Sequence, residues 1–274
     1  MRISGLLRNL LMKSRIDPIV NVANTADFIY SPPQSAIAAK RILVKPNLGY
    51  PVQAPVTVSI KVLAKVLAGL RLASPNAEIL IVEGVCSPIS LSEICDRQGL
   101  RNILDEGMQI LDADTLPCKE YVNLQPNPVR FKTMLAPTLL EEVDCRITVG
   151  AFKRTILKDE PLISASLKNL YGLFPRSHYK ARSPNSRGQL HRPSVPLILQ
   201  DVYFCIGHLF DGAVVDGDRR LMSPDWKPDK GRSVELGKVF WGDDPINVDR
   251  KACEIGGEEI PSYLDAIAKI RNDL

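Results

Sequence analysis

The sequence predicts an α/β protein: a largely parallel sheet with flanking helices, organised as two α/β halves that form a cleft. The first observation is an apolar strand at 41–48, RILVKPNL, in which a proline ends the run. The second is the segment 56–74, with apolar residues at helical spacing, followed by an apolar strand at 77–84. Strand, helix and strand at this spacing form a βαβ unit, and such units build parallel sheets.

The remaining elements follow from the same patterns. Thr57 or Ser59 is expected to cap the helix at 56–74, and a second helix is expected at 91–107, with Gly107 as its stop. Later in the chain we expect a buried strand at 141–152, a helix at 195–210, a strand at 212–218, a strand, a turn and a helix within 237–257, and a helix at 262–274.

This order of elements divides the chain into three segments. Residues 1–40 are expected to form an N-terminal amphipathic helix and a lead-in, 41–145 the first α/β half, and 146–274 the second half with a basic loop. With 274 residues, the chain is long enough to bury a core of this size.

Composition excludes several classes of protein. Hydrophobic residues make up 45% and charged residues 24% of the chain, which excludes a wholly disordered protein. The six cysteines include no CxxC pair, so we expect no iron–sulfur cluster and no cysteine-based metal site in this chain. We find no secretory signal and no apolar run of about 20 residues, and we therefore expect a cytoplasmic location.

The N-terminal stretch 2–15 has leucines at helical spacing, four basic residues and no acid. An amphipathic helix docked on the protein is the interpretation we favour. A subunit contact, or a peripheral contact with an anionic membrane through this helix, fits the same pattern.

Ionisable residues stand just past the C-terminal ends of four predicted buried strands: Lys45, Glu83, Lys153 and Asp216. In open parallel sheets, ligands bind in the crevice outside these ends. A strand that leaves into a polar loop explains any one of these residues, but the four together favour a shared cleft.

The segment from Ser164 to Pro193 contains six lysines and arginines and no carboxylate. Its Lys168-Asn169 pair offers an ammonium and an amide that can hold a carboxylate or phosphate, and Arg176 is a candidate for bidentate contacts with the same anion. Most of this segment otherwise has the composition of a solvated loop, and we assign Arg182 and Arg187 to such a loop. Nucleic acid is the weaker alternative, because aromatic residues make up only 6% of the chain.

Two aspartates are candidates for function, Asp216 and Asp249. Carboxylates opposite lysines can act as general bases, tune lysine pKa values or bind a hard divalent ion. Asp218 and Asp243 lie in the Asp-Gly-Asp and Asp-Asp-Pro segments and are assigned to turns.

Several segments, in this order, resemble the DUF362 family, whose function is undefined. They are ILVKPNL, VDCRITVGAFKR, SLKNLYGLFP, a downstream histidine at His191, VVDG and GDDPINVD, and the resemblance spans 41–257. It implies an α/β fold and a common polar site composed of Lys45, Asn47, Lys153, Lys168, Asn169, His191, Asp216 and Asp249.

The chain also departs from the family pattern. The family usually has a histidine after the lysine matched by Lys153, where this chain has Arg154-Thr155. A Gly-Pro-rich loop expected after Asp216 is replaced by DRRLMSPDWKPDKG, and the ferredoxin-like cysteine cluster of some members is missing. These differences count against a shared metal or redox role and leave the lysines unaffected.

The leading hypothesis is an enzyme that binds a small anionic metabolite and transfers protons, with Lys153 and His191 as the proton-transfer groups. Asp216 and Asp249 would orient or tune these groups. The residues expected to bind the substrate are Lys45, Asn47, Lys168, Asn169 and Arg176. No cofactor is predicted by name. The alternative is a non-catalytic ligand-binding or redox-accessory protein that uses the same pocket.

Overall fold

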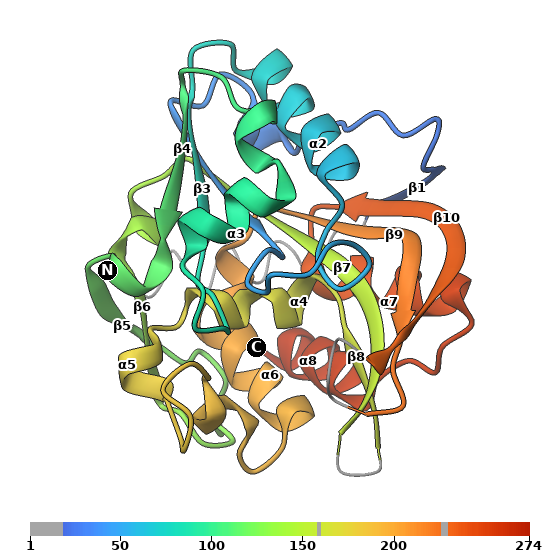
Figure 1. Ribbon diagram of the computed structural model, residues 1–274. Helices are drawn as coiled ribbons and strands as arrows, with labels where there is room; N and C mark the ends of the chain where they lie inside the picture. Colours follow the sequence, from blue (N-terminus) through green and yellow to red (C-terminus); the bar gives the residue numbers. More distant parts are fainter. Residues whose placement is uncertain (1–18, 158–159, 226–229) are drawn as a thin grey trace.

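The computed structural model describes residues 19–157, 160–225 and 230–274. Their centre is an eight-stranded sheet in the order β1-β10-β9-β7-β2-β3-β4, with β8 paired to β7 (Figure 1). The strands are β1 (Val20–Asn24), β2 (Arg41–Pro46), β3 (Glu78–Glu83), β4 (Met108–Asp112), β7 (Cys145–Leu157), β8 (Glu160–Ser164), β9 (Gly212–Met222) and β10 (Arg232–Gly242).

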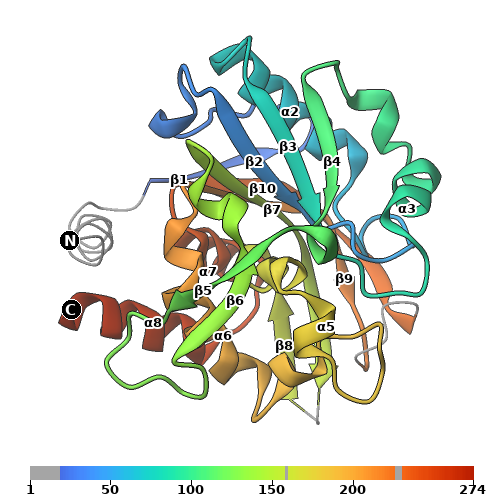
Figure 2. The ribbon, with the colours of Figure 1, turned by 90° about the vertical axis from the view of Figure 1, so that its left-hand side faces the viewer.

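The central strands of this sheet are parallel, which confirms the predicted fold class. β2 pairs in parallel with β3 and β7, β3 pairs with β4, and β7 pairs with β9. The pairs that involve β1, β8 and β10 are antiparallel. Because neighbouring parallel strands end at the same edge, the carboxyl ends of β2 and β3 lie together, pointing toward the region of α4 (Ser166–Asn169) and α5 (Arg176–Tyr179) (Figure 2).

Helices cover both faces of the sheet (Figure 1). Ile42 and Val44 of β2 belong to a core cluster with α2 (Ile60–Ala73) and α3 (Leu91–Gln98), whereas Leu43 belongs to a cluster on the opposite face. The opposite face carries α6 (Val195–Cys205), α7 (Pro245–Gly256) and α8 (Ser262–Asp273). Successive side chains of a strand point to opposite faces, so Lys45 points the same way as Leu43, toward α4 and α6.

Smaller elements complete the described part of the chain. β5 (Cys118–Val122) and β6 (Thr133–Pro137) form a two-stranded antiparallel sheet. Short 3-10 turns lie at Gln34–Ala36, Leu100–Ile103, Ala113–Thr115, Thr138–Glu141, Leu170–Leu173, Gly188–His191 and Gly207–Leu209.

The predicted helices at 56–74 and 262–274 are confirmed as α2 and α8. The helix predicted at 195–210 is α6, but it ends at Cys205 and a 3-10 turn follows at Gly207–Leu209. The hydroxyl of Ser59 caps α2 by accepting the backbone N–H of Val62 at 3.2 Å. The prediction of one helix over 91–107 is wrong, because α3 already ends at Gln98. Gly99 follows it with a φ of 73°, a left-handed conformation that favours glycine and stops the helix.

The two predicted halves contribute neighbouring strands to one sheet, since β2 of the segment 41–145 pairs with β7, most of which belongs to 146–274. The predicted helix at 2–15 lies outside the described residues. Among the residues that are described, no helix combines the length and the apolar character needed to cross a membrane.

Candidate functional site

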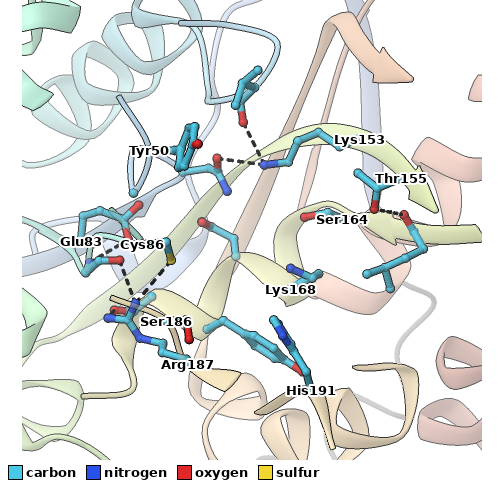
Figure 3. Close-up of a pocket in the computed structure, with 18 of the residues that line it drawn as sticks. Tyr50, Glu83, Cys86, Lys153, Thr155, Ser164, Lys168, Ser186, Arg187 and His191 are labelled. Carbon is cyan, nitrogen blue, oxygen red and sulfur yellow. Dashed lines mark hydrogen bonds between the residues drawn. The ribbon is translucent and has the colours of Figure 1, made fainter. Parts of the chain in front are cut away.

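A cavity of about 730 Å³ opens beside the carboxyl ends of β2 and β3. Both predicted halves line it, and six of the nine candidate site residues are in its wall, namely Lys45, Asn47, Lys153, Lys168, Asn169 and His191. Figure 3 shows Lys153, Lys168 and His191 among them. Three other candidates, Arg176, Asp216 and Asp249, are not among its lining residues.

The base of the cavity is a buried ion pair. Lys45, which is 0% exposed, lies near the end of β2, and its Nζ is 2.6 Å from Oε1 of Glu83, the last residue of β3. The same Nζ donates to Asn169 Oδ1 at 3.1 Å and to the carbonyl of Pro46 at 2.9 Å. Burial lowers the pKa of Lys45, and the Glu83 carboxylate opposes this change. Lys45 therefore has its charge neutralised and its donors occupied within the protein.

Glu83 is also held by the backbone around it. Its carboxylate accepts the N–H of Leu48 at 2.7 Å and that of Gly84 at 2.8 Å. Gly172 packs directly on the ion pair, and a Cβ added there would lie 2.8 Å from Nζ of Lys45 and closer still to Glu83. Only glycine fits at this position without displacing the pair.

Asn169 connects the ion pair to the sheet. It is 4% exposed, and its Nδ2 donates to the carbonyl of Lys45 at 2.7 Å and to Oγ1 of Thr148 at 3.1 Å. Its Oδ1 accepts from Lys45, so both ends of the amide are bound within the protein. The Asn169 side chain thus fixes α4 against β2 and β7.

Lys153 lies on the opposite side of the cavity. Its Nζ donates to the backbone carbonyl of Val56 at 2.9 Å and to Oδ1 of Asn47 at 3.2 Å. Burial, together with the neighbouring Lys168 ammonium, lowers the pKa of Lys153 to about 7. The sequence placed this lysine past the end of its strand, but β7 continues to Leu157 because β8 pairs with it.

Lys168 projects from α4 into the same cavity (Figure 3). Its Nζ lies 5.2 Å from the ring centroid of Tyr171, a cation–π contact. Within residues 19–157, 160–225 and 230–274, its ammonium forms neither a hydrogen bond nor an ion pair. Burial lowers the pKa of Lys168 as well. A partly buried ammonium without an anion is a site that a ligand can complete.

His191 and Lys168 both contact the ring of Tyr171. The His191 and Tyr171 rings are stacked, with centroids 6.0 Å apart and an angle of 27° between their planes. The Tyr171 hydroxyl donates to the carbonyl of Leu190 at 2.9 Å, which holds the ring against the turn that carries His191. Figure 3 shows His191 and Lys168 on the side of the cavity away from Glu83 and Cys86.

Asp249 positions α4 from behind the cavity. Its carboxylate accepts the N–H of Ser166 at 2.8 Å, the hydroxyl of Ser166 at 2.5 Å and the N–H of Leu167 at 3.0 Å. It is 0% exposed, and burial raises its pKa to about 6. These bonds fix the first turn of the short helix that carries Lys168 and Asn169.

Asp216 binds the backbone at the start of α2 in a similar way. It lies within β9, is 3% exposed, and accepts the N–H of Ser59, the capping residue of α2, at 2.8 Å. It also accepts the N–H of Asp218 at 3.1 Å. Burial raises the pKa of Asp216. Of the four strand-end residues, Lys45, Glu83 and Lys153 thus meet at the cavity, and Asp216 does not.

The basic loop contributes Arg187 to the cavity and not Arg176. Arg176 forms an ion pair with Asp114, in which Nε lies 2.6 Å from Oδ2 of the carboxylate. Both residues line a separate hollow. Arg187 was assigned from the sequence to a solvated loop, and this was wrong, because it is only 3% exposed. Its guanidinium contacts Asp114 at 3.2 Å and donates to the carbonyl of Val85 at 3.0 Å and to that of Phe174. It thereby binds the loop to the end of β3.

Two further features of the cavity wall were not found from the sequence. Cys86 is a free, exposed thiol whose Sγ lies 3.5 Å from Nη1 of Arg187. Three leucines, Leu157, Leu162 and Leu221, line the part of the cavity along β7, β8 and β9. The alternation of Lys153, Thr155 and Leu157 was a usable signal, since it places all three on one face of a strand.

Among the described residues, no group of three or more His, Cys, Asp or Glu side chains is arranged to hold a metal ion. The basic side chains that line the cavity are Lys45, Lys153, Lys168, Arg187 and His191. This arrangement can bind an anion, and it can exchange a proton at Lys153 near neutral pH.

Comparisons with known proteins agree with this architecture. The family model described as "Domain of unknown function (DUF362)" matches residues 42–254, well over half of the chain. No curated protein is significantly similar in sequence. Among solved structures, the lactate racemase apoprotein from Thermoanaerobacterium thermosaccharolyticum matches with a TM-score of 0.50 and 14% identity over 91% of this chain. The chain covers 55% of that protein, and at this identity the likeness extends to the fold alone.

Proposed function

The chain belongs to the DUF362 family, whose function is undefined, and we propose from its cavity that it is an enzyme that binds an anionic metabolite and transfers a proton. The anion is a carboxylate or a phosphate. One observation carries this proposal: Lys153 and Lys168 present two ammonium groups to one cavity, and neither has a carboxylate partner within the part of the chain that the structure describes.

In this proposal Lys168 binds the anion. Its ammonium forms no hydrogen bond or ion pair with the described residues, and burial penalises its charge until a counter-charge arrives. Lys45 is excluded from anion binding because its ammonium already contacts Glu83 and Asn169. The substrate-binding role first assigned to Lys45 and Asn169 therefore becomes one of support, in which they fix α4 at the cavity.

Lys153 is the proton-transfer group. A pKa of about 7 makes both its amine and its ammonium forms available at neutral pH, which is the condition for an efficient general acid or base. A bound anion at Lys168 lies close enough to Lys153 for the two charges to interact, since Lys168 contributes to the lowered pKa of Lys153. The atom that loses or gains the proton is then near the anionic group of the substrate.

His191 supplies a second acid or base, on the Lys168 side of the cavity. Asp249 and Asp216 act as positioning residues in this proposal, because their carboxylates bind the backbone at the starts of α4 and α2. The name of the structural neighbour, a lactate racemase, is compatible with a carboxylate ligand.

Hydrogen exchange at carbon tests the proposal. The purified protein is incubated in D₂O with a panel of 2-hydroxy, 2-oxo and 3-oxo carboxylates and their phosphorylated counterparts, and proton NMR follows the loss of C–H signals. We expect exchange with at least one class, a loss of about 10²-fold or more in rate for Lys153→Met, and weakened binding for Lys168→Met. Lys61→Met, on the exposed side of α2, is the matched control.

Two outcomes would overturn the proposal. One is exchange that persists unchanged in Lys153→Met, because the base would then lie elsewhere. The other is binding of panel members with no exchange of any, which would assign the cavity to a non-catalytic ligand-binding protein.

A further inference from the structure

The strands that line one side of the cavity change from charged to apolar along their length. Lys153, Thr155 and Leu157 alternate on β7, so all three side chains point to the same face, and all three line the cavity. Arg154 and Ile156, which point the other way, do not line it.

The partner strand β8 repeats this gradient, whereas β9 places a leucine, Leu221, in the row of Lys153 itself. Ser164 of β8 and Leu221 of β9 stand opposite Lys153 in the sheet register. In the next row, Leu162 of β8 stands opposite Thr155. Leu162 is 6% and Leu221 2% exposed, and both face the cavity. Directly opposed residues share a face, so the wall passes from an ammonium to leucines within a few rows.

The distance between the charged and the apolar end of β7 can be calculated. Strands rise about 3.3 Å per residue, so Lys153 and Leu157 are separated by about 13 Å along β7. Leu157 and Thr155 are only partly buried, which leaves this part of the wall accessible to a ligand. Lys153 begins this row of side chains, and Figure 3 shows Lys168 and His191 on the side of the cavity away from Arg187, Glu83 and Cys86.

The volume agrees with a ligand that extends along this wall. A cavity of about 730 Å³ is within the range that accommodates drug-sized ligands, and it is far larger than a carboxylate or phosphate group requires. A very small polar acid would leave the partly exposed Leu157 in contact with water, without using its burial for affinity.

We infer that the substrate is an amphiphilic anion, in which a carboxylate or phosphate group is joined to an apolar chain. The head group binds at Lys168 beside Lys153. The chain runs along β7 past Thr155 and ends against Leu157 and Leu162. This inference rests on the proposed function for the position of the head group, and adds the class of molecule that carries it.

A chain-length series tests the inference. Isothermal titration calorimetry measures the binding of acetate, butanoate, hexanoate, octanoate and decanoate, and of the matching alkyl phosphates, to the purified chain. We expect affinity to rise by up to about fourfold per methylene until the apolar wall is filled. The carboxylate and phosphate arms show which head group the lysines prefer.

Two variants change the wall without touching the cationic end. Leu157→Asn should weaken binding of octanoate by about tenfold or more and leave butanoate unchanged. Thr155→Val should strengthen octanoate binding, and such a gain cannot result from misfolding. Leu72→Asn is the control, because Leu72 is 84% exposed on α2, away from the cavity.

The outcomes separate this inference from the proposed function. Short and long chains that bind equally well would overturn the amphiphile inference and leave the anion site intact. An unchanged octanoate affinity in both Leu157→Asn and Thr155→Val would also overturn it. Failure of every anion to bind would overturn both the inference and the proposed function.

Discussion

Nζ of Lys45 and Oε1 of Glu83 lie 2.6 Å apart at the base of the cavity, with side chains only 1% and 4% exposed. This pair neutralises the most deeply buried cation of the site within the protein itself. The two remaining lysines, Lys153 and Lys168, are then the ones whose charge a ligand can compensate. In the proposed function, the pair thus separates one structural lysine from the two lysines that act on the ligand.

Breaking the pair should destabilise the fold. Lys45→Met leaves the Glu83 carboxylate buried without its counter-charge, and we expect a loss of about 3–5 kcal/mol in the free energy of unfolding. The double variant Lys45→Met/Glu83→Gln should recover part of this loss. Urea denaturation measures both, with Lys61→Met on the protein surface as the control. A Lys45→Met variant as stable as Lys61→Met would contradict the prediction.

The pKa of Lys153 should depend on Lys168. Removing the Lys168 charge eliminates one of the causes that lower the pKa of Lys153, so Lys168→Met should raise this pKa above about 7. NMR titration of ¹³C-labelled lysine side chains measures it directly. In the wild-type protein, exchange at carbon should become faster as the pH rises through about 7, because the neutral amine is the base. A lower Lys153 pKa in Lys168→Met would be the contrary result.

Asp249 should make stability fall as the pH rises from about 4 to about 6. Its pKa is about 3.9 in an unfolded chain and is raised to about 6 in the folded protein, so in this interval the folded state holds a proton that the unfolded state has lost. The stability of wild type relative to Asp249→Asn should therefore decline across the interval, by on the order of 2–3 kcal/mol.

Guanidinium denaturation at several pH values measures this difference. Asp265→Asn is the control, since the side chain of Asp265 is 64% exposed. A difference between wild type and Asp249→Asn that grows toward pH 6 would show that the sign is wrong.

The Cys86 thiol should report whether the cavity is occupied. It is exposed, whereas Cys118 is half-buried and Cys95, Cys145, Cys205 and Cys253 are buried, so iodoacetamide should modify Cys86 first. Octanoate at about ten times its Kd should slow this reaction about tenfold. Peptide mass mapping follows it, and Cys118 serves as the internal control. Equal protection of Cys118 and Cys86 would show that the effect is not local to the cavity.

The strands and the lysines could be predicted because their signals are local. Lys45 follows the apolar run Ile42-Leu43-Val44, and Lys153 follows another apolar run. Both were therefore assigned to the ends of buried strands, although the strand of Lys153 continues to Leu157. Parallel strands that end at one edge then bring such side chains together. This argument predicted that Lys45, Glu83, Lys153 and Asp216 would share a cleft. The first three line one cavity, and Asp216 does not.

Arg187 could not be assigned in the same way. It lies among Ser, Gly and Pro residues that suggest a solvated loop, and its partners Asp114 and Val85 are distant in sequence. For Asp216 and Asp249, the sequence did not distinguish a carboxylate that faces a cavity from one that accepts backbone N–H groups, because both types follow strands or begin helices. Their direct part in proton transfer stays a prediction.

The register between β7 and β8 has a consequence for how this protein can diverge. Because side chains alternate along a strand, one residue inserted between Lys153 and Leu157 would turn one end of the wall away from the cavity. Two inserted residues would keep both ends facing inward and lengthen the wall by about 6.6 Å. Relatives with a longer or shorter cavity should therefore differ here by even numbers of residues, which would adapt the site in discrete steps to molecules of different length.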